Sequence, residues 1–306
     1  MSAFLNKIEV GHVEAGLRTG DIMTPWPEEF NRKLVSLVAK YHFAPTPGAM
    51  DNLLSEGIKR HQILVTGNTV IDALFETLAL LNRDELFLSR FAQKYPFMQN
   101  DKKTILVTMH RRENFGTGVE DFCDALRSIA RRHPGVQIVF PVHLNPNIKK
   151  PVADAVANEP GIFLIEPMDY CDFVFMMKRS YLIITDSGGV QEEAPSLGKP
   201  VLVTRTSTER PEAVAAQTVR LVGTDRNLIL QWVDRLVVDS SEYSAMTQVT
   251  NPYGDGRASE RIVQSILDTD TSTSVNWVEK AYEYVREQRM KPVPLEPAGA
   301  AQVMVN

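Results

Sequence analysis

A turn from strand to helix at residues 185–189 carries groups that could bind an anion. The apolar run YLII at 181–184 predicts a buried strand, and Ser187 after it is a favourable residue to begin a helix. Gly188 and Gly189 lack Cβ atoms, so their backbone N–H groups can face outward toward a phosphate. An ordinary strand-to-helix turn is the alternative, and for an isolated Ser-Gly-Gly it is the better interpretation.

Two clusters near the N-terminus combine acids and bases beside predicted strands or helices. GHVEAGLRTG holds His12, Glu14 and Arg18, and PWPEEFNR places Glu28 and Glu29 in the first turn of a predicted helix. Carboxylates and a histidine of this kind could transfer protons. Carboxylates in a first turn also suit the helix dipole, so a purely structural role stays open for the second cluster.

The segment HRREN at residues 110–114 directly follows a predicted strand. His110, Arg111 and Arg112 would form a phosphate clamp at the carboxyl edge of a sheet, where open α/β sheets bind ligands. A charged loop in solvent is the alternative. TSTERPEA adds Arg210, and together the clusters describe a cleft for a diphosphate with acids and a histidine for proton transfer.

The elements that must position these groups alternate between short β-rich runs and longer amphipathic ones. Residues 67–257 contain the predicted strands TILVTM, VQIVFPV, IFLIEP, YLIITD, PVLVTR and TVRLVG, with helices or loops between them. This rhythm predicts one doubly wound α/β domain with a parallel sheet.

Residues 1–66 repeat the rhythm in a shorter form. They include a predicted helix, PEEFNRKLVSLVAKY, with apolar residues on one face: Phe30, Leu34, Leu37, Val38 and Tyr41. An α/β domain with its own core needs on the order of 100 residues, so we expect a remnant of an N-terminal Rossmann-like domain. Residues 258–272 are expected to form a helix that returns to this domain, and residues 273–306 a tail.

Composition argues against several classes of partner. The formal net charge of −5 provides no basic field for nucleic acid or an anionic membrane, so a charged substrate would need local Arg and His. Cys123 and Cys171 stand in unrelated contexts and the histidines lack metal-ligand spacing, so neither a disulfide framework nor a metal site is expected. No apolar run approaches the roughly 20 residues of a spanning helix, and no secretory segment follows Met1. We therefore expect a cytoplasmic protein.

In their order along the chain, the motifs resemble the non-hydrolysing bacterial UDP-N-acetylglucosamine 2-epimerases. The resemblance covers about residues 2–270 and is carried by GHVEAGLRTGD, PWPEEFNR, HRREN, PVHLNP, TDSGGVQEEAPSLGKPVLVTR, TERPEA and NPYGDGRASERI. It implies a GT-B-like fold of two Rossmann-like doubly wound domains with the nucleotide sugar between them. The implied reaction interconverts UDP-N-acetylglucosamine (UDP-GlcNAc) and UDP-N-acetylmannosamine (UDP-ManNAc) for surface polysaccharides, without a cofactor. Members of the family usually form homodimers.

The resemblance also implies roles for individual residues. Glu14 and Glu28 would be the acid and base carboxylates that move the C2 proton, and His110 would assist at the diphosphate. Arg111 and His143 resemble residues of a second site at which UDP-GlcNAc activates family members. The residues expected to bind the nucleotide sugar are Arg18, Arg111, Arg112, His143, Phe173 at the uracil, Ser187, Gly188 and Gly189 at the phosphates, Glu193 at the ribose, and Arg210.

The chain departs from the family pattern at its N-terminus. Family members carry a first strand, a Gly-Thr-Arg-Pro type loop and a catalytic aspartate upstream of the Glu14 motif, so we expect a fragment or a shortened gene product. Two alternatives to the function of a non-hydrolysing epimerase are a non-catalytic UDP-sugar-binding protein and a hydrolysing 2-epimerase that releases ManNAc and UDP. A glycosyltransferase is a further alternative, against which the pair of Glu14 and Glu28 argues.

Overall fold

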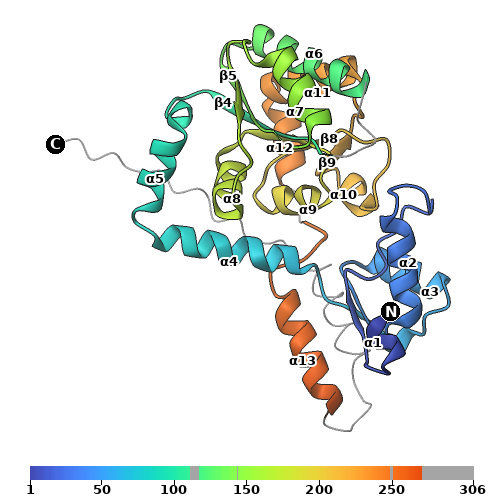
Figure 1. The fold of residues 1–306 in the computed structure, drawn as a ribbon. Helices are drawn as coiled ribbons and strands as arrows, with labels where there is room; N and C mark the ends of the chain where they lie inside the picture. The colour runs from blue at the N-terminus through green and yellow to red at the C-terminus, as the bar shows by residue number, and fades with distance from the viewer. Residues whose placement is uncertain (111–116, 143, 249–250, 271–306) are drawn as a thin grey trace.

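The computed structural model describes residues 1–110, 117–142, 144–248 and 251–270, which form two parallel β-sheets flanked by helices (Figure 1). The larger sheet has the order β6-β5-β4-β7-β8-β9, with every neighbouring pair parallel. Its strands are β4 (Lys103–Thr108), β5 (Val136–Pro141), β6 (Ile162–Ile165), β7 (Leu182–Thr185), β8 (Val201–Val203) and β9 (Val219–Leu221). The chain builds outward from β4 in one direction and from β7 in the other, which confirms the doubly wound α/β domain.

Helices cover both faces of the larger sheet because its central strands are apolar on both sides. In β4, Ile105 and Val107 belong to one core and Leu106 belongs to the other. The first core is closed by α6 (Thr117–Arg132), α7 (Pro146–Val156), α11 (Arg226–Val238) and α12 (Ser240–Thr247). The second is closed by α4 (Thr69–Arg83), α5 (Phe87–Lys94), the 3₁₀ turn Pro96–Met98, α8 (Tyr170–Arg179), α9 (Gly188–Ser196) and α10 (Pro211–Ala215). These layers hold the carboxyl ends of the strands rigidly along one edge.

The smaller sheet is built from residues 1–66. Its parallel strands are β1 (Gly11–Val13), β2 (Tyr41–Ala44) and β3 (Ile63–Val65), accompanied by α1 (Ser2–Leu5), α2 (Glu28–Val38), α3 (Pro47–Ser55) and the 3₁₀ turn Arg60–Gln62. Among the described strands β1 pairs with β2 alone, and its Val13 is 41% exposed. The outer edge of β1 therefore has no neighbouring strand among the described residues.

The helix predicted within residues 27–41 forms as α2, but its apolar residues do not make a buried face. Phe30 is 48% exposed and Leu37 is 78% exposed, whereas Glu29 is fully buried. Tyr41 does not belong to the helix and opens β2 instead. The helix is therefore confirmed without Tyr41, and the residues that it buries are the polar Glu29 and Ser36.

The segment NPYGDGR at residues 251–257 packs against the chain where it passes from the smaller sheet to the larger domain. The Tyr253 carbonyl accepts a hydrogen bond from the Asn68 N–H at 2.7 Å. Gly254 has a φ of 128°, and a Cβ there would lie 3.2 Å from the Cα of Gly67, so only glycine fits this approach. From this junction α13 (Ala258–Asp270) begins against α4 and runs toward the side where α1 to α3 lie (Figure 1).

Candidate functional site

The candidate site lies at the carboxyl edge of the larger sheet, between β4 and β7. The direction of winding reverses between these strands, and the crevice at such a point is the usual ligand site of open α/β sheets. His110 follows β4 and Asp186 follows β7. The backbone N–H of His110 donates to the Asp186 carboxylate at 3.0 Å, and its Nδ1 lies 2.9 Å from Oδ1 of the same group. Because a buried carboxylate engages Nδ1, the ring is oriented to exchange a proton through Nε2.

The Ser-Gly-Gly turn begins α9, as the sequence predicts. Ser187 is the residue before the helix, and its backbone N–H donates to Oγ1 of Thr185 at 2.9 Å, while its side chain makes no capping bond. A Cβ on Gly188 would lie 2.4 Å from Nη1 of Arg210. Glycine therefore lets a guanidinium group sit beside the helix N-terminus, and that combination suits a phosphate.

Arg210 is fixed rather than mobile. It is 5% exposed, and it donates from Nε to Glu192 and from Nη1 to Glu209, both at 2.5 Å. Arg205 and Arg32 also pair with Glu209, at 2.9 and 3.3 Å. Burial alone would raise the pKa of Glu209, but the three guanidinium groups hold it well below its usual range. The charge beside Gly188 is thus held in place before any ligand arrives.

Glu192 joins this cluster to the smaller sheet. Burial raises the pKa of its carboxyl to about 7, an effect that Arg210 opposes and Glu14 reinforces. Its Oε2 accepts a hydrogen bond from Nδ2 of Asn68, and the same Nδ2 donates to Oε1 of Glu14 at 2.7 Å. One amide group therefore links a carboxylate from each part of the molecule.

Glu14 follows β1 in an uncommon backbone conformation. Its φ is 61°, in the left-handed region that residues other than glycine rarely adopt. Strain of this kind persists where the surrounding structure holds it, often at functional sites. The structure thus places Glu14 beside Asn68 and the buried Glu192. Glu14 itself is exposed, so burial alone would not identify it as a functional residue.

The two adjacent acids of α2 lie in different environments. Glu28, the acid assigned to catalysis, is exposed, whereas Glu29 is fully buried. Oε1 of Glu29 accepts from the Gly20 N–H at 3.3 Å, and its Oε2 lies 3.5 Å from Nη1 of Arg32. Solvent access suits Glu28 to proton exchange, while Glu29 is held by contacts inside the protein.

Arg18, one of the residues expected to bind the nucleotide sugar, is held by side chains from residues 1–66. Its guanidinium forms a bidentate pair with Glu56, at 2.9 and 2.7 Å, and also donates to Oγ of Ser36. The nearby His12 has its pKa lowered to about 4, mainly by burial and then by His42. Arg18 is thus engaged by partners of its own part of the chain, and its assignment to the nucleotide sugar stays a prediction.

Glu193 lies close to the glycine turn. It is 5% exposed, its Oε1 accepts from the Tyr170 hydroxyl at 2.6 Å, and burial raises the pKa of its carboxyl. A Cβ on Gly189 would lie 3.6 Å from its Oε2, which places this oxygen beside the turn. Phe173, on the neighbouring α8, is partly buried and packs on the second core.

Arg111, Arg112 and His143 lie outside the described residues. Within the part of the chain that the structure describes, no group of three or more His, Cys, Asp or Glu side chains could hold a metal ion. In that same part, no helix has the length and apolar character needed to cross a membrane. Cys123 is buried and Cys171 is exposed, and neither contributes to the site.

Sequence analysis assigned no role to several residues that shape the site. Asp186 carried a local signal, since an acid directly after a strand at a glycine turn is well placed to face a ligand. Asn68 and Glu192 carried none, because their partners lie between 18 and 124 positions away along the chain, whereas Glu209 stands beside Arg210 and four residues after Arg205. The residues are Asn68, Asp186, Glu192 and Glu209.

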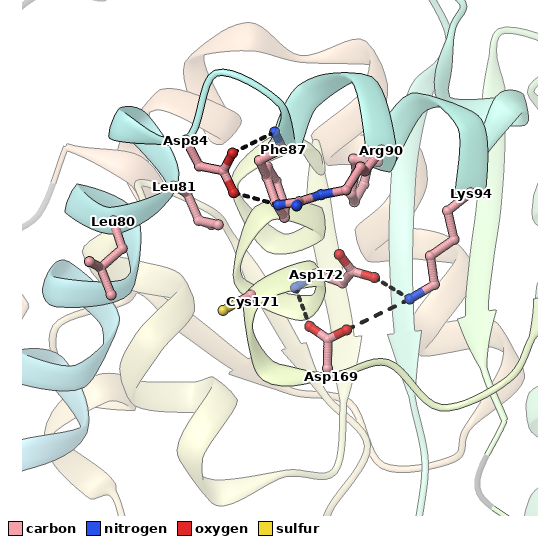
Figure 2. Close-up of a pocket in the computed structure, with 10 residues that line it drawn as sticks. Leu80, Leu81, Asp84, Phe87, Arg90, Lys94, Asp169, Cys171 and Asp172 are labelled. Atoms are coloured by element: carbon pink, nitrogen blue, oxygen red, sulfur yellow. Dashed lines mark hydrogen bonds and ion pairs between the residues drawn. The ribbon is translucent and has the colours of Figure 1, made fainter.

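A separate groove of about 410 Å³ lies between α4, α5 and α8 (Figure 2). Its apolar floor includes Leu81 and Phe87. Lys94 pairs with Asp172 at 2.5 Å and with Asp169 at 3.7 Å, so the charges at the rim compensate one another (Figure 2). The groove shares no lining residue with the site at the switch point.

Residues 1–267 match the family model described as UDP-N-acetylglucosamine 2-epimerase. The chain is 54% identical to the UDP-N-acetylglucosamine 2-epimerase of Escherichia coli K12 over 272 residues, which are 89% of this chain and 72% of that protein. The chain belongs to the UDP-N-acetylglucosamine 2-epimerase family. The enzyme of that name from Yersinia pestis is 54% identical over 87% of this chain and 71% of its own length.

Solved structures of UDP-N-acetylglucosamine 2-epimerases share the fold. The Neisseria meningitidis enzyme bound to UDP-GlcNAc is 48% identical, with a TM-score of 0.85 over 87% of this chain and 72% of that one. The UDP co-structure of Staphylococcus aureus MnaA is 44% identical, with a TM-score of 0.82 over 90% of this chain and 73% of that one. These matches and the parallel sheets confirm a GT-B-like α/β fold.

Proposed function

We propose that this chain interconverts UDP-GlcNAc and UDP-ManNAc by eliminating UDP from the sugar and adding it back. The observation that carries the proposal is that a turn suited to a phosphate and a carboxylate of the smaller sheet are connected through one buried cluster of side chains. Arg210 beside Gly188 forms the turn side, and Glu14 is tied to the same buried cluster through Asn68. A relative crystallised with UDP-GlcNAc supports this choice of substrate.

The nucleotide would bind along the edge of the larger sheet. The backbone N–H groups of Gly188 and Gly189 and the hydroxyl group of Ser187 would hold the diphosphate at the N-terminus of α9, with Arg210 supplying a positive charge. Glu193 would accept hydrogen bonds from the ribose hydroxyls. The further contacts that we propose for the nucleotide sugar, by resemblance to the family, come from Arg111, Arg112, His143 and Phe173.

The proposed reaction needs proton transfer on both faces of the sugar. A carboxylate removes the C2 proton, the C1–O bond breaks, and the electron pair of the C2–H bond forms the C1–C2 double bond of a glycal while UDP stays bound. UDP then adds to C1 as a proton is delivered to the opposite face of C2. We assign these steps to Glu14 and Glu28.

His110 would act at the leaving diphosphate. Its ring is oriented by Asp186, so it can donate a hydrogen bond or a proton to a phosphate oxygen as negative charge develops there. The N-terminus of α9 stabilises the same charge. Retention of UDP by these groups is what would distinguish epimerisation from hydrolysis.

Incubation with UDP-GlcNAc and separation of the products tests the proposal. We expect UDP-ManNAc, and in D₂O we expect deuterium at C2, because the abstracted proton exchanges before it returns. Release of UDP and ManNAc would instead identify a hydrolysing 2-epimerase. Binding of UDP-GlcNAc without any product would identify a non-catalytic UDP-sugar-binding protein.

We also propose the biological setting that the family resemblance implies. The chain would act as a homodimer in the cytoplasm and supply ManNAc units for surface polysaccharides, without a cofactor. Sedimentation of the purified chain across a range of concentrations tests the dimer, and a single monomeric species would contradict it.

A further inference from the structure

Asn68 lies where the chain passes from the smaller sheet into α4, and it is 1% exposed. Its Nδ2 donates to Oε1 of Glu14 at 2.7 Å and also to Oε2 of Glu192. The two carboxylates stand 54 and 124 positions away along the chain. Because an amide NH₂ group has two hydrogens, it can serve both carboxylates at once.

The backbone fixes the orientation of this amide. Its Oδ1 accepts from the Val70 N–H at 3.3 Å as the cap of α4, and the Asn68 N–H donates to the Tyr253 carbonyl. A flipped amide would turn its oxygen toward two carboxylate oxygens and lose the capping bond. The donor face of Asn68 is therefore held toward Glu14 and Glu192.

Charged and titratable groups face Glu192 from several elements. Arg210 donates to it from the start of α10, and Glu14 lies beyond Asn68 after β1. The pKa of Tyr253, whose hydroxyl group donates to Glu212 at 3.3 Å, is raised by burial and then by the charges of Glu212 and Glu192. The backbone carbonyl of Glu192 accepts from Nδ2 of Asn251 at 2.6 Å, which anchors this turn of α9. Glu192 is thus held by several contacts, and the amide group of Asn68 connects it to Glu14.

We propose that Asn68 is a positioning residue for proton transfer, because it holds the carboxylate of Glu14 in register with the buried Glu192–Arg210 pair. The proposal rests on the proposed epimerase function and adds to it a residue that touches no reacting atom. Loss of the two amide hydrogen bonds should release the strained Glu14 and disturb C2 proton transfer. Nucleotide binding by the N-terminus of α9 should change little, since Asn68 reaches this helix at Glu192 and not at the turn of residues 187–189.

The kinetic test compares Asn68→Ala and Asn68→Asp with the control Asn52→Ala. Asn52 is also an amide donor near Glu14, but it donates to the Gly16 backbone carbonyl at 2.9 Å and to no carboxylate. We expect Asn68→Ala to lower kcat by about 10²-fold, as misplacement of a catalytic group does, with KM and UDP affinity little changed. Asn52→Ala should lower stability without that loss of kcat. A rise in KM with unchanged kcat in Asn68→Ala would overturn the proposal.

The variant Asn68→Asp keeps the size of the side chain and places a third carboxyl group between two others. Its activity should be lowest above neutral pH and recover in part as the pH falls, because a protonated Asp can donate a hydrogen bond again. A pH profile of kcat parallel to that of the unsubstituted chain would contradict the assigned role. If Asn68→Ala does not fold, Asn68→Asp still tests whether Asn68 positions Glu14 for proton transfer.

A titration of the ligand-free chain supplies a readout that needs no turnover. The ¹³C resonance of the Glu192 carboxyl, identified by its loss in Glu192→Gln, reports the protonation of that group. Since Asn68 donates to the charged form, Asn68→Ala should raise the midpoint by about one pH unit above its starting value. An unchanged midpoint would overturn the coupling. If the unsubstituted chain makes no UDP-ManNAc, the proposed function fails, and this titration still shows whether Asn68 links the two carboxylates.

Discussion

Replacement of Gly188 by alanine tests whether the glycine turn and Arg210 form one rigid unit. An added Cβ would lie 2.4 Å from Nη1, 2.8 Å from Cζ and 3.0 Å from Nη2 of the Arg210 side chain. A flexible side chain would swing away at little cost. Arg210 cannot do so easily, because Glu192 and Glu209 hold it from two sides in a buried setting.

The expected loss of stability follows from these contacts. Displacement of Arg210 strains or breaks two hydrogen bonds between charged groups, each worth about 1.5–3 kcal/mol. Removing one partner from a buried ion pair typically costs 3–5 kcal/mol in other proteins. We therefore expect Gly188→Ala to lower the free energy of unfolding by roughly 3 kcal/mol, and to weaken UDP binding because the guanidinium leaves the phosphate site.

Gly189→Ala is a matched control on the next residue of the same helix. Its Cβ would meet Oε2 of Glu193 at 3.6 Å, an ordinary van der Waals contact, so the substitution should leave the free energy of unfolding within about 1 kcal/mol. Urea denaturation of both variants gives the comparison, and calorimetry gives the UDP affinity. In a background of Arg210→Ala, the change at Gly188 should cost little more. Equal stability of the two glycine variants would refute the reasoning.

Three further predictions concern the acids of the cleft. The pKa of Glu192 rises from 4.5 to about 7 on folding, so its stabilising contribution is complete below about pH 4.5 and is lost as the pH rises through about 7. In urea denaturation, the free energy of unfolding of the unsubstituted chain should therefore fall across that window relative to that of Glu192→Gln. Glu28→Gln should lower turnover by about 10²–10⁴-fold with little effect on stability, while Glu29→Gln should chiefly lower stability, and steady-state kinetics with urea melts would expose the reverse pattern. Glu193→Ala should weaken UDP binding by about 1.5–3 kcal/mol, and unchanged affinity in calorimetry would remove its assignment to the ribose.

The larger domain could be predicted from the sequence because its signals are local. Apolar β-branched runs alternate with amphipathic helices, and this pattern alone specifies a doubly wound parallel sheet. The turn at residues 185–189 was predicted for the same reason, since the residue types that begin a helix are neighbours along the chain. The family could be predicted from the order of the motifs along the chain.

The smaller sheet shows the limit of local patterns. The apolar spacing of α2 predicted a common face, yet Phe30 and Leu37 are largely exposed. Periodicity shows which residues share a side of a helix, but it does not show which side meets the rest of the molecule. That choice depends on elements that lie far away in the sequence.

The sequence by itself determined the types of groups available for chemistry and the turn that presents them. Only the tertiary structure decided which of them meet. It joined Glu14 and Glu192 through Asn68, and it placed Arg210 against Gly188 although 22 residues separate them along the chain. It also paired Arg18 with Glu56, 38 positions further along the chain. Such contacts depend on how segments distant in sequence pack together, and no local propensity encodes the distance between their side chains.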